Sequence, residues 1–69
     1  MITEQQALEI ARKDAATAYR DLSIYTVRVS HEPDGWHVDY DLTDPKMLGG
    51  GPHYVISESG QIAQKRYEQ

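Results

Sequence analysis

The side chains best suited to catalysis or metal binding stand at alternate positions in one short segment. His37, Asp39 and Asp41 are each separated by a single residue. In a β-strand such residues project from the same face, roughly 6–7 Å apart along the chain. An imidazole and two carboxylates on one face could bind a metal ion or act as general acid and base. The same spacing also describes the solvated face of a half-exposed sheet, or an acidic face that binds a partner, so three interpretations stay open.

The strongest turn signal in the chain follows directly. Residues 44–52 read Asp-Pro-Lys-Met-Leu-Gly-Gly-Gly-Pro. Glycine adopts backbone angles that are closed to other residues, whereas proline fixes φ and lacks an N–H donor. The segment is therefore incompatible with a helix interior or a central strand, and it predicts a shaped loop between two strands. Its structural residues are Gly49, Gly50, Gly51 and Pro52.

Two apolar residues inside this loop make it a candidate binding element. Met47 and Leu48 either fold back onto the core or project as an apolar knob. Loops on a rigid scaffold often carry functional residues. We therefore expect the loop and the alternating polar face to form one partner-binding surface. The residues of this predicted surface are His37, Asp39, Asp41, Asp44, Met47, Leu48 and His53.

Other chemistries lack the residues that they need. The glycine run is not followed by Gly-Lys-Ser or Gly-Lys-Thr and opens no predicted helix, which argues against a phosphate-binding loop. The serines lack the sharp strand-to-helix turn of a catalytic nucleophile. The chain contains 0 cysteines, so it forms no disulfide and no thiolate metal site. Its 69 residues supply little material for an enclosing pocket. We expect a protein that is not an enzyme and that holds neither a cofactor nor a metal.

Length and charge narrow the class of partner. The 69 residues fit a single domain, 1–69, with 11 acidic and 7 basic residues and a net charge of −4. This balance argues against nucleic acid and against an anionic membrane, and it favours a basic protein partner. So small a domain buries only about 60% of its unfolded surface, so a second copy could stabilise it and a homodimer stays open. The first residues show neither a basic region nor a long apolar run, from which we expect a cytoplasmic protein.

A helix and several strands must position these residues. Thr3 and Gln6 have the spacing of a capping box at a helix start. The apolar residues that follow recur at steps of three and four, which predicts one amphipathic helix. They are Ala7, Leu8, Ala11, Ala15, Ala18, Tyr19 and Leu22. Because so many are alanines, we expect the helix to approach the sheet closely.

The rest of the chain alternates with the period of β-strands. The segments concerned are 23–31, 36–43, 53–57 and 62–67, with turns at 32–35 and 58–61. The apolar set from Trp36 to Leu42 should face the helix. The predicted fold class is therefore α+β, with one N-terminal amphipathic helix packed on an antiparallel sheet of three to four strands. The last strand ends in Lys65 and Arg66, which suits a sheet edge.

Four segments together carry a family resemblance. They are a helix that begins Ile-Thr-Glu-Gln-Gln-Ala-Leu-Glu-Ile-Ala, an Asp-Gly-Trp hairpin, the Leu-Gly-Gly-Gly-Pro loop and a closing hairpin Tyr-Val-Ile-Ser-Glu-Ser-Gly-Gln-Ile. In this combination the chain resembles the small bacterial immunity proteins of nuclear-transport-factor-two-like fold, the YbbC-like family. The likeness covers nearly the whole chain, and the glycine loop is its most specific element. A complete fold of that type needs more helices and a longer sheet, so we expect a minimal module with one helix and four strands.

The resemblance implies a function in bacterial competition. Members of this family are encoded beside a polymorphic or secreted toxin, bind that toxin and protect the producing cell. We accordingly expect a non-enzymatic immunity protein that occludes a cognate toxin. The alternative is a regulatory module similar to PepSY domains, which acts on a peptidase or an envelope enzyme and shares the same general plan. A third hypothesis, a metal-binding enzyme subunit, would require a stoichiometric ion.

Overall fold

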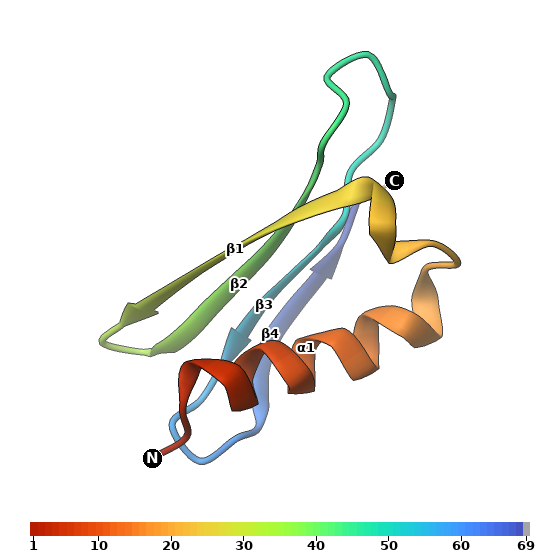
Figure 1. Cartoon of the computed structure of the whole chain (residues 1–69). Helices are drawn as coiled ribbons and strands as arrows, with labels where there is room; N and C mark the ends of the chain where they lie inside the picture. Colours follow the sequence, from red (N-terminus) through yellow and green to blue (C-terminus); the bar gives the residue numbers. More distant parts are fainter. Residues whose placement is uncertain (69) are drawn as a thin grey trace.

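The computed structural model describes residues 1–68 and contains one long helix packed on a four-stranded sheet (Figure 1). The elements are α1 (Glu4–Ala18), the short 3-10 helix η1 (Leu22–Ile24), β1 (Tyr25–Glu32), β2 (Gly35–Leu42), β3 (Pro52–Ile56) and β4 (Ile62–Tyr67). All neighbouring strands are antiparallel, in the order β1-β2-β3-β4. This arrangement confirms the predicted α+β class and gives the sheet four strands.

Helix α1 begins and packs as the sequence predicts. The Thr3 hydroxyl accepts a hydrogen bond from the Gln6 N–H at 3.1 Å, and the Gln6 side chain accepts one from the Thr3 N–H at 2.9 Å. This capping box satisfies N–H groups that the first turn of a helix leaves unpaired. Ala7, Ala11 and Ala15 are fully buried. Their small side chains let the helix axis lie close to the sheet.

The core lies entirely between α1 and one face of the sheet. Val38 and Tyr40 of β2 and Tyr54 and Ile56 of β3 are buried against the three alanines. Trp36 is half-buried at the end of this core, where its ring stacks on His31 with centroids 4.0 Å apart. Figure 1 shows no element on the opposite face of the sheet among the described residues. The fold is therefore two layers, one helical and one β.

All five tyrosines form one continuous row, of which Tyr40 and Tyr54 lie in this core. Their rings meet edge to face in the order Tyr67, Tyr19, Tyr25, Tyr40 and Tyr54, with centroid distances of 5.8, 5.9, 6.1 and 6.5 Å. Such edge-to-face pairs contribute beyond the area they bury. The row links the end of α1 to every strand of the sheet.

One helical carboxylate joins the two ends of the row. Asp14 of α1 accepts hydrogen bonds from the hydroxyls of Tyr54, at 2.9 Å, and Tyr67, and from the Lys65 ammonium at 3.3 Å. These donors, Tyr67 first, hold the pKa of the Asp14 carboxyl below its usual range although burial opposes them. Burial and the same contact raise the pKa of Tyr54. Asp14 thereby ties α1 to β3 and β4.

Three sequence expectations need correction. Tyr19 and Leu22 lie outside α1, which ends at Ala18. The first strand begins at Tyr25 rather than at Ser23, because the Asp21 carboxylate accepts a hydrogen bond from the Ser23 N–H and caps η1.

Pro52 is the third correction, since it is the first residue of β3 and not part of the loop. Pairing of β3 with β2 starts only at His53, opposite Asp39. Pro52 would come next in this ladder, opposite Tyr40, and because it has no N–H to donate, the pairing with β2 ends before it; a proline is tolerated in this inner strand because it is the first residue.

Candidate functional site

The sheet face that α1 leaves uncovered, here called the open face, carries the polar side chains of all four strands. Strand register and alternation place eleven residues on it: Thr26, Arg28, Ser30, Glu32, His37, Asp39, Asp41, His53, Val55, Gln64 and Arg66. The predicted grouping of His37, Asp39 and Asp41 on one face is confirmed. The register also brings His53 directly opposite Asp39, on two strands whose alignment the sequence alone does not give.

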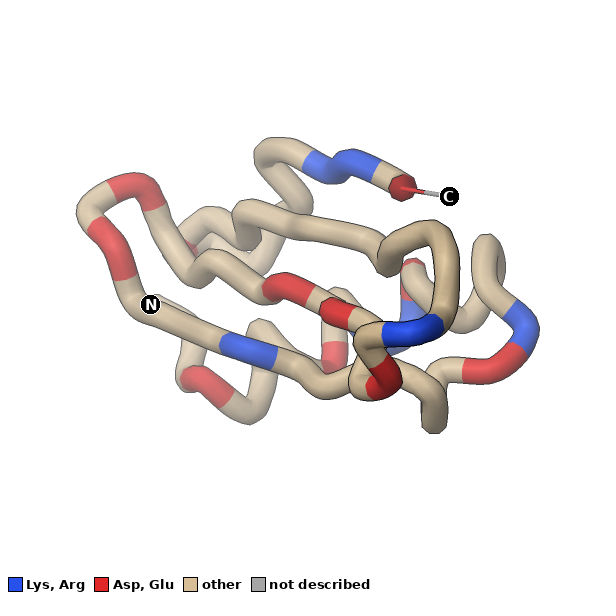
Figure 2. The backbone as a smooth tube through the Cα atoms, turned by 90° about the horizontal axis from the view of Figure 1, so that it is seen from above, with Lys and Arg blue, Asp and Glu red and all other residues tan. Residues whose placement is uncertain are grey.

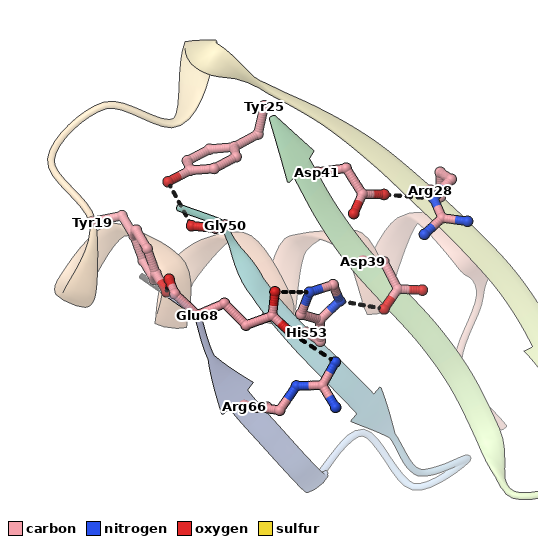
Figure 3. Close-up of polar contacts among 9 residues, drawn as sticks. All are labelled: Tyr19, Tyr25, Arg28, Asp39, Asp41, Gly50, His53, Arg66 and Glu68. Carbon is pink, nitrogen blue, oxygen red and sulfur yellow. Dashed lines mark hydrogen bonds and ion pairs between the residues drawn. The ribbon is translucent and has the colours of Figure 1, made fainter. Parts of the chain in front are cut away.

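A chain of charged groups crosses the open face from β2 to the C-terminal end of β4 (Figure 3). His53 Nδ1 lies 2.7 Å from Asp39 Oδ1, and because a carboxylate only accepts, this nitrogen donates. His53 Nε2 lies 3.6 Å from Glu68 Oε2, whose other oxygen is 3.1 Å from the Arg66 guanidinium. The His53 side chain is only 17% exposed. Two carboxylates thus hold this imidazole in one orientation.

The same residues border a shallow hollow on the open face. Its volume is about 320 Å³. The lining residues are His37, Asp39, His53, Tyr54, Val55, Gln64, Lys65 and Arg66. Val55 is the apolar member that faces outward, between imidazole, amide and guanidinium groups. A hollow of this kind can receive one side chain of a partner, whose apolar part would lie on Val55 and whose polar end would meet the surrounding charges.

Charges on the open face are paired rather than uniformly acidic. Asp41 Oδ2 lies 2.6 Å from Arg28 Nε, and Asp39 is bonded to His53. Acidic positions of β2 lie between a basic position of β1 on one side and basic positions of β4 on the other (Figure 2). The expectation of an acidic face that steers a basic partner is therefore weakened, because the net charge of −4 is not gathered there.

His37 takes part in a local contact at the β1–β2 turn. Its Nε2 lies 2.7 Å from Asp34 Oδ1, three residues earlier in the chain. This hydrogen bond lowers the pKa of the exposed Asp34 carboxyl. His37 therefore lines the hollow at the end near the β1–β2 turn, while His53 lines it at the end near the β2–β3 loop.

The loop between β2 and β3 projects beyond the end of the sheet (Figure 1). Of the two alternatives for its apolar residues, the structure shows the outward one: Leu48 is 97% exposed and Met47 is 43% exposed. Asp44 faces its own loop, where its carboxylate accepts a hydrogen bond from the Lys46 N–H at 2.9 Å. Asp44 and the apolar tip therefore lie apart from the charged chain around His53, but on the same end of the molecule.

The glycines give the loop a defined shape. Gly49 has a φ of 102°, which favours glycine. A Cβ at Gly51 would come within 2.5 Å of the Tyr40 carbonyl oxygen and 2.9 Å of the Tyr25 ring. The Tyr25 hydroxyl donates to the Gly50 carbonyl at 3.3 Å. The base of the loop is thus packed against the tyrosine row, and only its tip extends into solvent.

Sequence reasoning missed several members of this surface. Arg28 pairs with Asp41 across the β1–β2 hairpin, and Val55, Arg66 and Glu68 complete the hollow and the charged chain. The position of Arg28 could have been predicted from the sequence, since the turn at 33–34 fixes the register of the hairpin. Glu68 follows the last strand, and nothing in the sequence pattern indicates that it folds back toward His53.

Among residues 1–68, no group of three or more His, Asp and Glu side chains is placed to hold a metal ion. In the same part of the chain, no helix is long and apolar enough to cross a membrane. No protein-family model, curated protein or solved structure that was compared with the chain matches it.

Proposed function

We propose that this protein is an immunity protein, which binds a cognate bacterial toxin and neutralises it by occlusion, without catalysis. The observation that carries the proposal is the open face and its adjoining loop, an uncovered surface that ends in the almost fully exposed Leu48. A domain of 69 residues that leaves a large apolar side chain on a shaped loop has a candidate anchor for another protein. The sequence resemblance to immunity proteins indicates the class of partner, a bacterial toxin.

The apolar tip supplies the affinity in this proposal. Burying a leucine side chain contributes roughly 1.5–3 kcal/mol, which corresponds to roughly 10- to 100-fold in affinity. The loop base is already ordered by Tyr25 and Gly51, which reduces the conformational entropy that is lost when the tip is bound.

The paired charges of the open face supply specificity instead. Asp41 and Arg28 already satisfy one another, so a partner must match both signs to lie against them. A partner surface that presents only one sign there would leave a buried charge without its counterpart, which disfavours it strongly.

The test begins with the protein encoded immediately upstream. Co-expression should give a stable complex and should rescue growth of cells that produce the toxin. With purified complex, Leu48→Ser is expected to weaken binding roughly 10- to 100-fold, whereas Lys13→Ala on the exposed side of α1 should change it less than twofold. Asp41→Lys tests the open face, because it reverses one charge without breaking the Asp39–His53 hydrogen bond.

Three results would contradict the proposal in different ways. Rescue without a complex would indicate indirect protection. A complex that tolerates both Leu48→Ser and Asp41→Lys would exclude this surface. Neither complex nor rescue would remove the immunity proposal, and specific inhibition of a peptidase would then favour the PepSY-like alternative.

A further inference from the structure

The two free edges of the sheet differ in how they are protected. Strand β4 has six residues, a register shift opposite Val55 and Ile56, and the cations Lys65 and Arg66. Strand β1 has eight residues, and its pairing with β2 runs without interruption from Tyr25 to Glu32. Bulges and positive charges discourage the addition of another strand, and β1 lacks a bulge and carries a single cation, Arg28. Strand β1 is thus the regular, accessible edge (Figure 1).

The ladder between β1 and β2 shows which backbone groups of β1 are free. The Thr43 N–H donates to the Ile24 carbonyl at 2.9 Å, so the next pair along the ladder, Tyr25 and Leu42, is a non-hydrogen-bonded pair. By alternation, the even-numbered residues of β1 bond to β2. The N–H and C=O groups of Tyr25, Val27, Val29 and His31 therefore point away from the sheet.

Apolar side chains accompany these free backbone groups. Val27 and Val29 lie on the helix side of β1, but α1 lies mainly over the middle strands, and Val27 remains 40% exposed. A strand added beside β1 would cover Val27 and satisfy the outward N–H and C=O groups at the same time. This combination of bare backbone and bare apolar surface is what β-strand addition requires.

We propose that β1 pairs antiparallel with β1 of a second copy of this chain, about a two-fold axis through Val29. Side chains on one face must oppose side chains on the same face, and near the middle of the strand this leaves the registers centred on Val27, Arg28 and Val29. The Arg28 register places two guanidinium groups opposite each other and is unfavourable. The Val27 register leaves the end of the strand, from Ser30 onward, without a partner.

The Val29 register uses the strand from Thr26 to Glu32 and is complementary. It sets Val29 against Val29, Val27 against His31, Arg28 against Ser30 and Thr26 against Glu32, so no like charges are directly opposed. Val27, Val29 and His31 would each direct backbone donors and acceptors at the other copy. Two four-stranded sheets would join into one continuous sheet.

The symmetry of this dimer has a consequence for binding. A two-fold axis perpendicular to the sheet keeps both α1 helices on one side and both open faces on the other. The dimer would present two hollows to the same side, and its two loop tips would project from opposite ends of the joined sheet. The inference does not depend on the identity of the partner, since it concerns only the association of this chain with itself.

Cysteine cross-linking tests the register, because the chain has 0 native cysteines. In an antiparallel hydrogen-bonded pair the Cα atoms are about 5.5 Å apart, which a disulfide can span. Val29→Cys should therefore form a disulfide-linked dimer under mild oxidation, whereas Gln64→Cys on β4 should not. A mixture of Val27→Cys and His31→Cys should cross-link between the two variants but not within either one.

Sedimentation equilibrium over a concentration series provides the second measurement. Wild type should dimerise, and Val27→Lys should weaken the dimer at least tenfold, while Gln64→Lys on the other edge should leave it unchanged. Trp36 fluorescence checks that each variant is folded. A monomer at every concentration would overturn the proposal, as would a dimer that cross-links through Gln64→Cys. Self-cross-linking of Val27→Cys would replace the Val29 register with the Val27 register.

Discussion

Replacing Asp14 by alanine should destabilise the fold far more than replacing any exposed carboxylate of the same helix. Asp14 accepts three hydrogen bonds from β3 and β4, and its side chain is 20% exposed. In Asp14→Ala these donors lose their common acceptor. The Tyr54 hydroxyl suffers most, because Tyr54 is only 2% exposed and has little access to water.

The magnitude follows from the hydrogen bonds to a charged group. Each contributes roughly 1.5–3 kcal/mol, and a buried donor left without a partner loses a similar amount. Because Tyr67 and Lys65 can be partly hydrated in the variant, we expect Asp14→Ala to lower the free energy of unfolding by about 3 kcal/mol. Native proteins have a free energy of unfolding of roughly 0.05–0.15 kcal/mol per residue, which gives roughly 3.5–10 kcal/mol for a chain of 69 residues. Asp14→Ala should therefore lower Tm by roughly 12–24 °C.

Urea unfolding followed by the single tryptophan, Trp36, measures this change. Glu9→Ala is the matched control, since Glu9 lies on α1 and pairs with Arg12 in an exposed position with side chains 49% and 56% exposed. Its expected effect is small, because an exposed ion pair contributes little to stability. A double-mutant cycle between Asp14→Ala and Tyr54→Phe should give a coupling energy of about 1–2 kcal/mol. Equal losses for Asp14→Ala and Glu9→Ala, with no coupling to Tyr54, would refute the anchoring role.

The pH dependence of stability gives an independent check. Hydrogen bonds, that from Tyr67 first, lower the pKa of Asp14 in the folded protein. The stabilisation is then complete above the unfolded pKa of about 3.9, and it is lost as the pH falls through the lower pKa of the folded state. Wild type should lose stability more steeply than Asp14→Asn below about pH 4. Parallel curves for the two proteins would contradict the assignment.

Three further substitutions test the loop and the helix start. Gly51→Ala should cost roughly 1–3 kcal/mol because its Cβ would meet backbone atoms, whereas Gly50→Ala would meet only the flexible Glu68 side chain and should cost much less; urea midpoints compare the two. Thr3→Ala should remove about 1 kcal/mol with the capping box, measured against Thr17→Ala, whose exposed hydroxyl bonds only to the Asp14 carbonyl of the same helix. Leu48→Ser should leave Tm within about 1–4 °C of wild type, and a larger fall would show that the loop tip packs on the protein.

Local patterns accounted for most of the fold. The capping box, the alanine stripe and the alternation of β2 each depend on neighbours within a few residues, and each is present in the structure. The exposed polar face of β2 followed from the same alternation. Boundaries were less accurate where a side chain competes for the backbone, as Asp21 does when it caps η1 and delays the start of β1.

Contacts between distant segments were not predictable in the same way. Asp14 lies off the apolar stripe of α1. Its contribution to stability comes from hydrogen bonds with Tyr54 and Tyr67, which are 40 and 53 residues away in the chain. The position of Glu68 beside His53 likewise depends on how β4 ends against β3. A periodic pattern tells which face a residue occupies, but the partner on that face is set by the register of the whole sheet.

The exposed surfaces of this protein follow from its size. A single helix covers only the middle of a four-stranded sheet, so with one helix the sheet keeps an uncovered face and two free edges. The chain protects these surfaces unequally: the open face has paired charges and β4 has a bulge and cations, while the Leu48 tip and the β1 edge are left bare. Since a bare apolar tip and a bare edge both favour association, they are where the proposed partner and the second copy would bind. The Leu48 tip lies on the loop between β2 and β3, whereas the bare edge is the backbone of β1, so the two sites use different residues.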